Sequence, residues 1–119
     1  MLPTSLERLD MGELRQRLGN DEALIADVLR LFLEDCPARL GAIESAVAAR
    51  RLDAVRRGAH TLKGSAGTLS AVGVAEAAAT LEDIAARNDV ASLDHQCATL
   101  AVEVERLVAE LRGLSPADI

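Results

Sequence analysis

The sequence predicts an all-α fold: an antiparallel up-down four-helix bundle with a short additional helix at its N-terminus. Hydrophobic residues make up 50% of the 119 residues and aromatic residues only 1%, so small aliphatic side chains must build the core, which suits close helix packing. Apolar residues recur at steps of three and four, the period of an amphipathic helix. The segments between these stripes are short, which predicts that neighbouring helices are antiparallel.

The first two helices are predicted from a cap and from a long apolar stripe. Asp10 can cap a short helix over residues 11–18, and the run Gly19-Asn20-Asp21 ends this helix and starts the next. The stripe that follows stays in phase across Pro37, so we expect one long helix over residues 22–49. The proline removes one backbone hydrogen bond and should kink this helix rather than end it.

Three further helices are expected in the rest of the chain. The third covers residues 52–69 and is followed by a turn over residues 70–73. The fourth stops near residue 88, and a last helix of about five turns carries an apolar seam over residues 93–111. We expect a single domain over the whole chain, residues 1–119, with its core over about residues 8–112.

Charge and composition exclude several classes of function. A formal net charge of −6 argues against a nucleic-acid or anionic-membrane binder, whose partners would be repelled. No apolar run reaches the ~18 residues of a membrane span, and no signal peptide is evident. Cys36 and Cys97 lie on apolar stripes and are expected to be free, buried thiols. We therefore expect a soluble, cytoplasmic monomer that binds no metal, since the acidic pair Glu34-Asp35 has no third ligand at suitable spacing.

His60 is the candidate reactive residue. On a helical wheel it points roughly 130–140° away from the apolar face of the third helix, so its imidazole should be exposed. Three glycines, Gly58, Gly64 and Gly67, occur in the same helix, where each costs roughly 1 kcal/mol relative to alanine. We find no packing reason for them in the sequence. They predict a cleared approach to the imidazole.

Positive charge gathers around this histidine. Lys63, the single lysine of the chain, follows it by three residues, and Arg56 and Arg57 precede it. Close cations disfavour protonation of the imidazole and offset negative charge on an incoming group. A solvated helix face is the alternative interpretation of these cations, as it is of the neighbouring Arg50 and Arg51. The second histidine, His95, lies off the apolar seam of the last helix and is interpreted as a surface residue.

The run Ala59-His60-Thr61-Leu62-Lys63-Gly64-Ser65-Ala66 resembles the signature of histidine-containing phosphotransfer (HPt) domains, the helical phosphorelay modules of two-component signalling. The resemblance covers about residues 8–112. It includes the runs Leu18-Gly19-Asn20-Asp21 and Leu31-Phe32-Leu33-Glu34-Asp35-Cys36-Pro37, and the pair Leu81-Glu82. The pair Arg50-Arg51 departs from the family, which often has Gly-Asp there, so the third helix should lack a strong N-cap.

The resemblance implies that His60 accepts a phosphoryl group from a receiver-domain aspartyl phosphate and passes it to another receiver. The chain would be a phosphocarrier rather than a stand-alone enzyme and would bind no cofactor, because the receiver brings Mg²⁺. Glu82 matches a family position that can hydrogen-bond the second imidazole nitrogen; a carboxylate there would hold the proton on Nδ1 and leave Nε2 as the nucleophile. Response-regulator receivers and hybrid sensor histidine kinases are the implied partners, with these residues as candidate contacts: Arg56, Arg57, Lys63, Gly64 and Gly67.

Three other functions are weighed against phosphotransfer. A helical docking module that has lost phosphotransfer would lack the histidine or the glycine beside it, and both are present. The phosphoacceptor domain of a chemotaxis-type kinase shares the bundle and the histidine-lysine-glycine core, but it receives phosphate from ATP through its own kinase domain. A hydrolase is disfavoured, because no serine or cysteine nucleophile is paired with a base.

Overall fold

The structure, a computed structural model, describes residues 2–114, so residue 1 and residues 115–119 of the predicted domain lie outside it. It confirms the all-α prediction: these residues form five helices and no strand. The helices are α1 (Met11–Arg17), α2 (Glu22–Ala48), α3 (Leu52–Thr68), α4 (Val72–Ala86) and α5 (Val90–Arg112).

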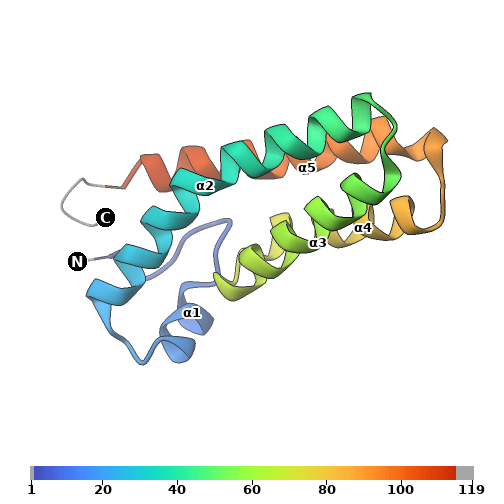
Figure 1. The fold of residues 1–119 in the computed structure, drawn as a ribbon. Helices are drawn as coiled ribbons and strands as arrows, with labels where there is room; N and C mark the ends of the chain where they lie inside the picture. Colours follow the sequence, from blue (N-terminus) through green and yellow to red (C-terminus); the bar gives the residue numbers. More distant parts are fainter. Residues whose placement is uncertain (1, 115–119) are drawn as a thin grey trace.

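The four long helices enclose one aliphatic core. Helix α3 packs against α2 and α4, and α5 packs against the same two helices from the other side. Figure 1 shows α2 beside α5 and α3 beside α4, with α1 at the end where α3 meets α4. The molecule is elongated, 44 × 23 × 19 Å, and Phe32 is the one aromatic residue in the core. The long axis therefore runs along the helices, and α3 presents one face to solvent over its whole length.

Local sequence signals agree with the start of α1, the course of α2 and the start of α3. The Asp10 carboxylate accepts a hydrogen bond from the Glu13 N–H at 2.9 Å, as predicted for the cap of α1. Helix α2 is continuous through Pro37. No side chain caps the start of α3 at Arg51, which agrees with the weak cap expected there.

The predicted turn before α4 and the predicted length of α5 are wrong. Helix α4 begins at Val72, so the turn predicted over residues 70–73 is shorter; Gly73 is helical, and a Cβ on it would lie 2.6 Å from Glu103 Oε2. This glycine therefore leaves room for the Glu103 carboxylate. Helix α5 has 23 residues, about six turns, more than the five turns expected.

Each junction between helices turns at a residue with left-handed backbone conformation. The residues are Asn20, Arg50, Ser70 and Asn88, with φ between 55° and 59°. A left-handed residue after a helix lets the next N–H groups bond back to its last carbonyls, which reverses the chain over few residues. At Arg50 the turn is also tied to α5, because its guanidinium donates two hydrogen bonds to Asp94, at 2.9 and 2.8 Å.

Both cysteines are free and buried, as predicted. Burial raises the pKa of the Cys36 thiol to about 11 and also raises that of Cys97. Neither thiol is a nucleophile at neutral pH. Among the helices of residues 2–114, none is both long and apolar enough to cross a membrane.

Candidate functional site

His60 lies in the middle of α3 on the side that faces solvent. The opposite side of the helix is fixed in the core by Val55, Ala59, Leu62 and Ala66, none of which has any exposed surface. The His60 side chain is 65% exposed as a result. A rigid helix thus presents the imidazole outward, as the helical wheel predicted.

Glu82 of α4 holds both His60 and Lys63. Its Oε2 lies 2.7 Å from Nδ1 of the imidazole, and its Oε1 accepts a hydrogen bond from the Lys63 ammonium at 2.7 Å. The Glu82 side chain is only 21% exposed, between the two helices. An ionised carboxylate can only accept, so the proton of a neutral imidazole lies on Nδ1. The lone pair of Nε2 is then left for chemistry.

Lys63 favours the ionised form of this carboxylate. The hydrogen bond from its ammonium is the largest influence on Glu82 and holds the pKa of that carboxyl below its ordinary value, against the opposing effect of burial. The hydrogen bond from His60 lowers the pKa of Glu82 further. The expectation that Lys63 acts as a free cation beside the ring is therefore incomplete, because its charge is first used to balance Glu82.

The three glycines of α3 have two different roles. A Cβ built on Gly64 or Gly67 meets no atom within 4 Å, so the surface beside His60 is open along two turns. A Cβ on Gly58 would lie 2.9 Å from Cγ1 of Ile43 on α2. The prediction that none of these glycines has a packing reason is wrong for Gly58, which allows α2 and α3 to approach each other.

The arginines before His60 are exposed on the first turns of α3. Arg56 and Arg57 form no ion pair with any of residues 2–114, whereas Arg50 is paired with Asp94. This pairing lowers the pKa of Asp94. His95 is exposed on α5, in agreement with its interpretation as a surface residue. No three potential metal ligands of histidine, cysteine or acidic type gather within the described part of the chain.

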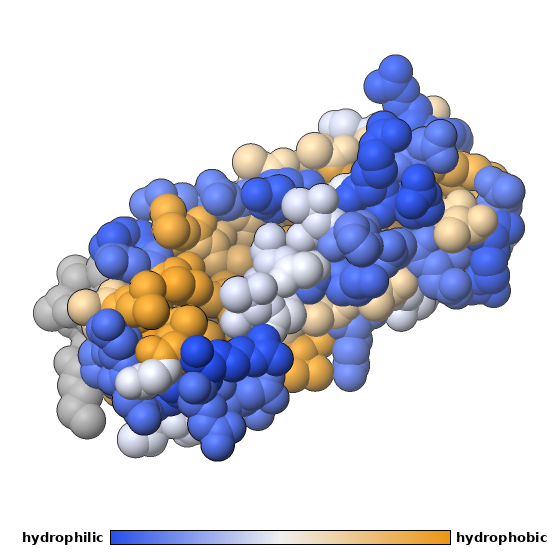
Figure 2. Space-filling view, turned by 60° about the horizontal axis from the view of Figure 1, so that its bottom comes forward, coloured by the Kyte–Doolittle hydropathy of each residue, from blue (hydrophilic) through white to orange (hydrophobic). Residues whose placement is uncertain are grey.

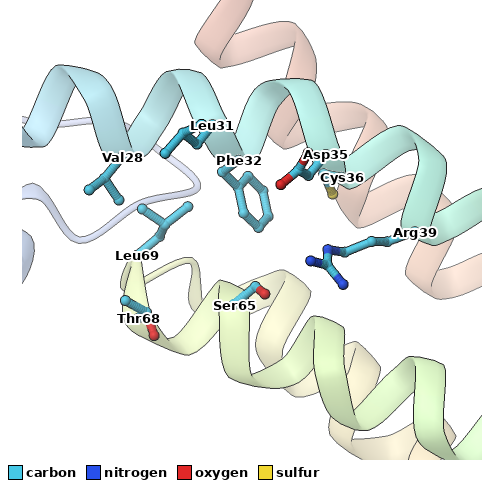
Figure 3. A pocket seen from close by; sticks show the side chains of 9 residues that line it. All are labelled: Val28, Leu31, Phe32, Asp35, Cys36, Arg39, Ser65, Thr68 and Leu69. Carbon is cyan, nitrogen blue, oxygen red and sulfur yellow. The ribbon is translucent and has the colours of Figure 1, made fainter.

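A groove between α2 and α3, close to the glycines, was missed by sequence reasoning. Its apolar wall comes from α2 and its rim includes two hydroxyl side chains of α3; it is lined by Val28, Leu31, Phe32, Asp35, Cys36, Arg39, Ser65, Thr68 and Leu69. Figure 3 shows Phe32 pointing from α2 toward α3, beside Leu69. The sequence signal for this groove was Leu31, an apolar residue that lies off the buried stripe of α2. The Leu31 residue is 56% exposed. Figure 2 shows hydrophobic surface on one face of the molecule, bordered by a pale band of intermediate hydropathy and by charged surface.

Comparisons with known proteins agree with this geometry. Residues 27–113, most of the chain, match the Hpt domain family. A crystal structure of histidine-containing phosphotransfer protein B (HptB) from Pseudomonas aeruginosa PAO1 has the same fold, with a TM-score of 0.82 and 24% sequence identity over 91% of this chain and 94% of that one. A comparison with curated protein sequences finds no significant match. The chain belongs to the Hpt domain family, the histidine phosphotransfer modules of phosphorelays.

Proposed function

We propose that His60 is the phosphoacceptor of this module. Nε2 attacks the phosphorus of an aspartyl phosphate on a receiver domain; an N–P bond forms as the bond from phosphorus to the aspartate oxygen breaks. The reverse steps on a second receiver deliver the phosphoryl group to its aspartate. The single observation that carries the proposal is the exposed imidazole whose Nδ1 is held 2.7 Å from Glu82. Phosphoryl transfer needs mainly such positioning together with charge stabilisation.

The side chains around His60 then have separate tasks. Glu82 orients the ring and accepts from Nδ1–H, and Lys63 balances the charge of Glu82. Gly64 and Gly67 leave room for the backbone of the receiver. Mg²⁺ and most catalytic groups belong to the receiver, so this chain acts as a carrier. Its antiparallel up-down bundle, α2–α5, presents His60 to the receiver.

Receiver domains and histidine kinases are the partners of Hpt domains in phosphorelays. For this chain we propose a monomer that meets receivers one at a time. We also propose a cytoplasmic location, supported by the two free thiols, which suit a reducing compartment. Arg56 and Arg57, which form no ion pair within residues 2–114, supply local positive charge on a chain of net charge −6. Such charge steers an acidic receiver toward His60 and accelerates the encounter.

Incubation with phosphorylated receiver domains tests the proposal. Label should move from receiver to wild-type chain, in a form that is labile to acid and stable to alkali. It should be absent from His60→Gln, with the helical circular dichroism spectrum retained, and undiminished in His95→Gln. Label that persists in His60→Gln refutes the assignment, and receiver binding without any transfer would identify a docking module instead.

A further inference from the structure

Two cationic side chains flank His60 at equal spacing along α3. Lys63 follows the histidine by three residues, and Arg57 precedes it by three. At about 100° per residue, the two cations lie about 60° to either side of the imidazole around the helix. Lys63 contacts Glu82 of α4, so its side of α3 is the side that faces α4. Arg57 therefore lies on the other side of the imidazole, away from α4.

The two nitrogens of the His60 ring face these two sides. Glu82 holds Nδ1 from α4 at 2.7 Å. Nδ1 and Nε2 point in nearly opposite directions from an imidazole ring, so Nε2 points away from α4, toward the side of Arg57. Side chains of a helix also lean toward its N-terminal end, which places the imidazole over the turn that carries Arg57. A phosphoryl group on Nε2 would thus form beside Arg57 rather than beside Lys63.

The Arg57 guanidinium is available for such a group. Arg57 is exposed and forms no ion pair in the part of the chain that the structure describes, residues 2–114. The Lys63 ammonium, in contrast, is bound to Glu82 at 2.7 Å. Arg57 lines a hollow at the start of α3 together with two further arginines and one carboxylate: Arg50, Arg51 and Asp53. Positive charge therefore exceeds negative charge on this side of the imidazole.

We propose that Arg57 binds the phosphoryl group of phosphorylated His60 and so stabilises the phosphohistidine. This inference rests on the proposed function and adds a direct contact to the steering of receivers. A guanidinium presents parallel N–H groups that match two phosphoryl oxygens, and contacts between charged groups of this kind are the stronger ones. Arg56, four residues before His60, lies about 40° around the helix on the side of Lys63, so it does not share the contact.

The charge state of the phosphoryl group reports this contact directly. A cation beside the group favours its doubly charged form and lowers its pKa. The chain is phosphorylated with phosphoramidate, whose P–N bond breaks with release of ammonia as the N–P bond to His60 forms, and phosphorus NMR follows the titration. Arg57→Gln should raise the proton affinity of the phosphoryl group about 2- to 5-fold at low salt. Arg57→Lys keeps the charge and should retain most of the wild-type value.

Arg51→Gln is the matched control. It removes the same charge from the same hollow, but residue 51 lies about 180° around α3 from His60 and about 13 Å along it. It should change the proton affinity of the phosphoryl group less than Arg57→Gln does. Asp53→Asn removes a carboxylate one turn before Arg57 and should lower this proton affinity. No change in Arg57→Gln, an equal change in Arg51→Gln or a larger one in Arg56→Gln overturns the proposal.

Transfer from a labelled receiver separates this inference from the proposed function. At equilibrium with the receiver, Arg57→Gln should hold about 2- to 5-fold less label than wild type. If the wild type takes label from phosphoramidate but from no receiver, the proposed function fails, and the phosphorus titration still decides the role of Arg57. If it takes label from neither donor, Nε2 of His60 is not an accessible nucleophile and both proposals fail.

Discussion

Replacing Glu82 with glutamine and, separately, with alanine should separate the two contributions of this side chain to phosphotransfer. Glutamine keeps a carbonyl oxygen that can accept a hydrogen bond from Nδ1–H of His60, but it carries no charge. Alanine removes both the acceptor and the charge, and it also removes the partner of the Lys63 ammonium. Orientation of the ring should therefore survive in Glu82→Gln and fail in Glu82→Ala.

The charge matters because the ring becomes positive when it carries phosphate. Nδ1 keeps its proton while Nε2 bonds to phosphorus, so the contact with Glu82 changes from a hydrogen bond to an ion pair. An ion pair between solvent-exposed side chains contributes about 0.2–1 kcal/mol. The imidazole is 65% exposed but Glu82 only 21%, so we take the upper end of this range, about 1 kcal/mol. Loss of the charge should shift the equilibrium from phosphohistidine toward receiver aspartyl phosphate about fivefold.

Lys63 complicates this comparison and also supplies its control. Glu82→Gln frees the Lys63 ammonium, which can then attract the phosphoryl group and mask the lost charge. Glu82 and Glu82→Gln are therefore also compared in a Lys63→Met background, where Glu82 is the charged group that remains beside the imidazole. We expect the fivefold shift to be clearest there. Glu82→Ala should, in addition, slow transfer several-fold, far less than the loss of His60.

The assay mixes each variant with a labelled receiver and measures the label on both proteins at equilibrium and over time. Nitrogen NMR of the imidazole reports the tautomer. The proton should stay on Nδ1 in Glu82→Gln and exchange between both nitrogens in Glu82→Ala. An unchanged equilibrium in Lys63→Met/Glu82→Gln relative to Lys63→Met, together with unchanged tautomer signals in Glu82→Ala, would show that Glu82 does not act on His60.

The lowered pKa of Glu82 adds a dependence on pH. A carboxyl whose pKa is lower in the folded than in the unfolded state stabilises the fold fully above its unfolded pKa. This contribution declines as the pH falls through the folded pKa, when the carboxylate is protonated in both states. The ordinary value is 4.5 and Lys63 lowers it, so the melting temperatures of wild type and Glu82→Gln should converge below pH ~4.5. A difference that stays constant into acid contradicts the ionised state assigned to Glu82.

Other predictions concern the glycines and arginines of α3. Gly64→Ala should stabilise the fold by up to about 1 kcal/mol. Gly58→Ala should be less stable than Gly64→Ala by about 1–3 kcal/mol in urea unfolding, because a Cβ at residue 58 meets Ile43. Equal stabilities of the two variants would refute the packing role of Gly58. Gly64→Gln should melt no lower than wild type yet transfer phosphate far more slowly, and an unchanged rate would show that this surface is not an approach. Replacing Arg56 and Arg57 with serine should slow receiver association in stopped-flow measurements and flatten its salt dependence, and equal rates at low salt would leave them as a solvated face.

The helices were predictable because their signals are local. Apolar stripes and an acidic cap gave α1, α2 and α3 within a residue or two of their observed ends. The errors concern residues whose role depends on distant segments. Gly73 reads as a turn residue, but it is helical, and its missing side chain leaves room for the Glu103 carboxylate of α5. No pattern within α4 contains that information.

In the candidate site, too, the features set by one helix were predictable and those set by contacts between helices were not. His60 and the open surface at Gly64 follow from the period of one helix, and the geometry agrees with both. The contact between Lys63 and Glu82 joins residues 19 apart on two helices, so the wheel of α3 alone placed Lys63 beside the ring as a free cation. Gly58 was misread for the same reason, because the atom that it accommodates belongs to α2.

The arrangement of charges suits the phosphotransfer that we propose at His60. When the imidazole is neutral, the charges of Glu82 and Lys63 cancel, so the site itself adds no net charge for an incoming phosphoryl group to overcome. After transfer the ring is positive and strengthens its contact with Glu82, which weakens the hold of that carboxylate on Lys63. The ammonium is then better able to turn toward the phosphoryl oxygens. The imidazole is 65% exposed in this structure, and ion pairs at such exposed sites are weak, which suits a carrier whose phosphoryl group the next receiver removes.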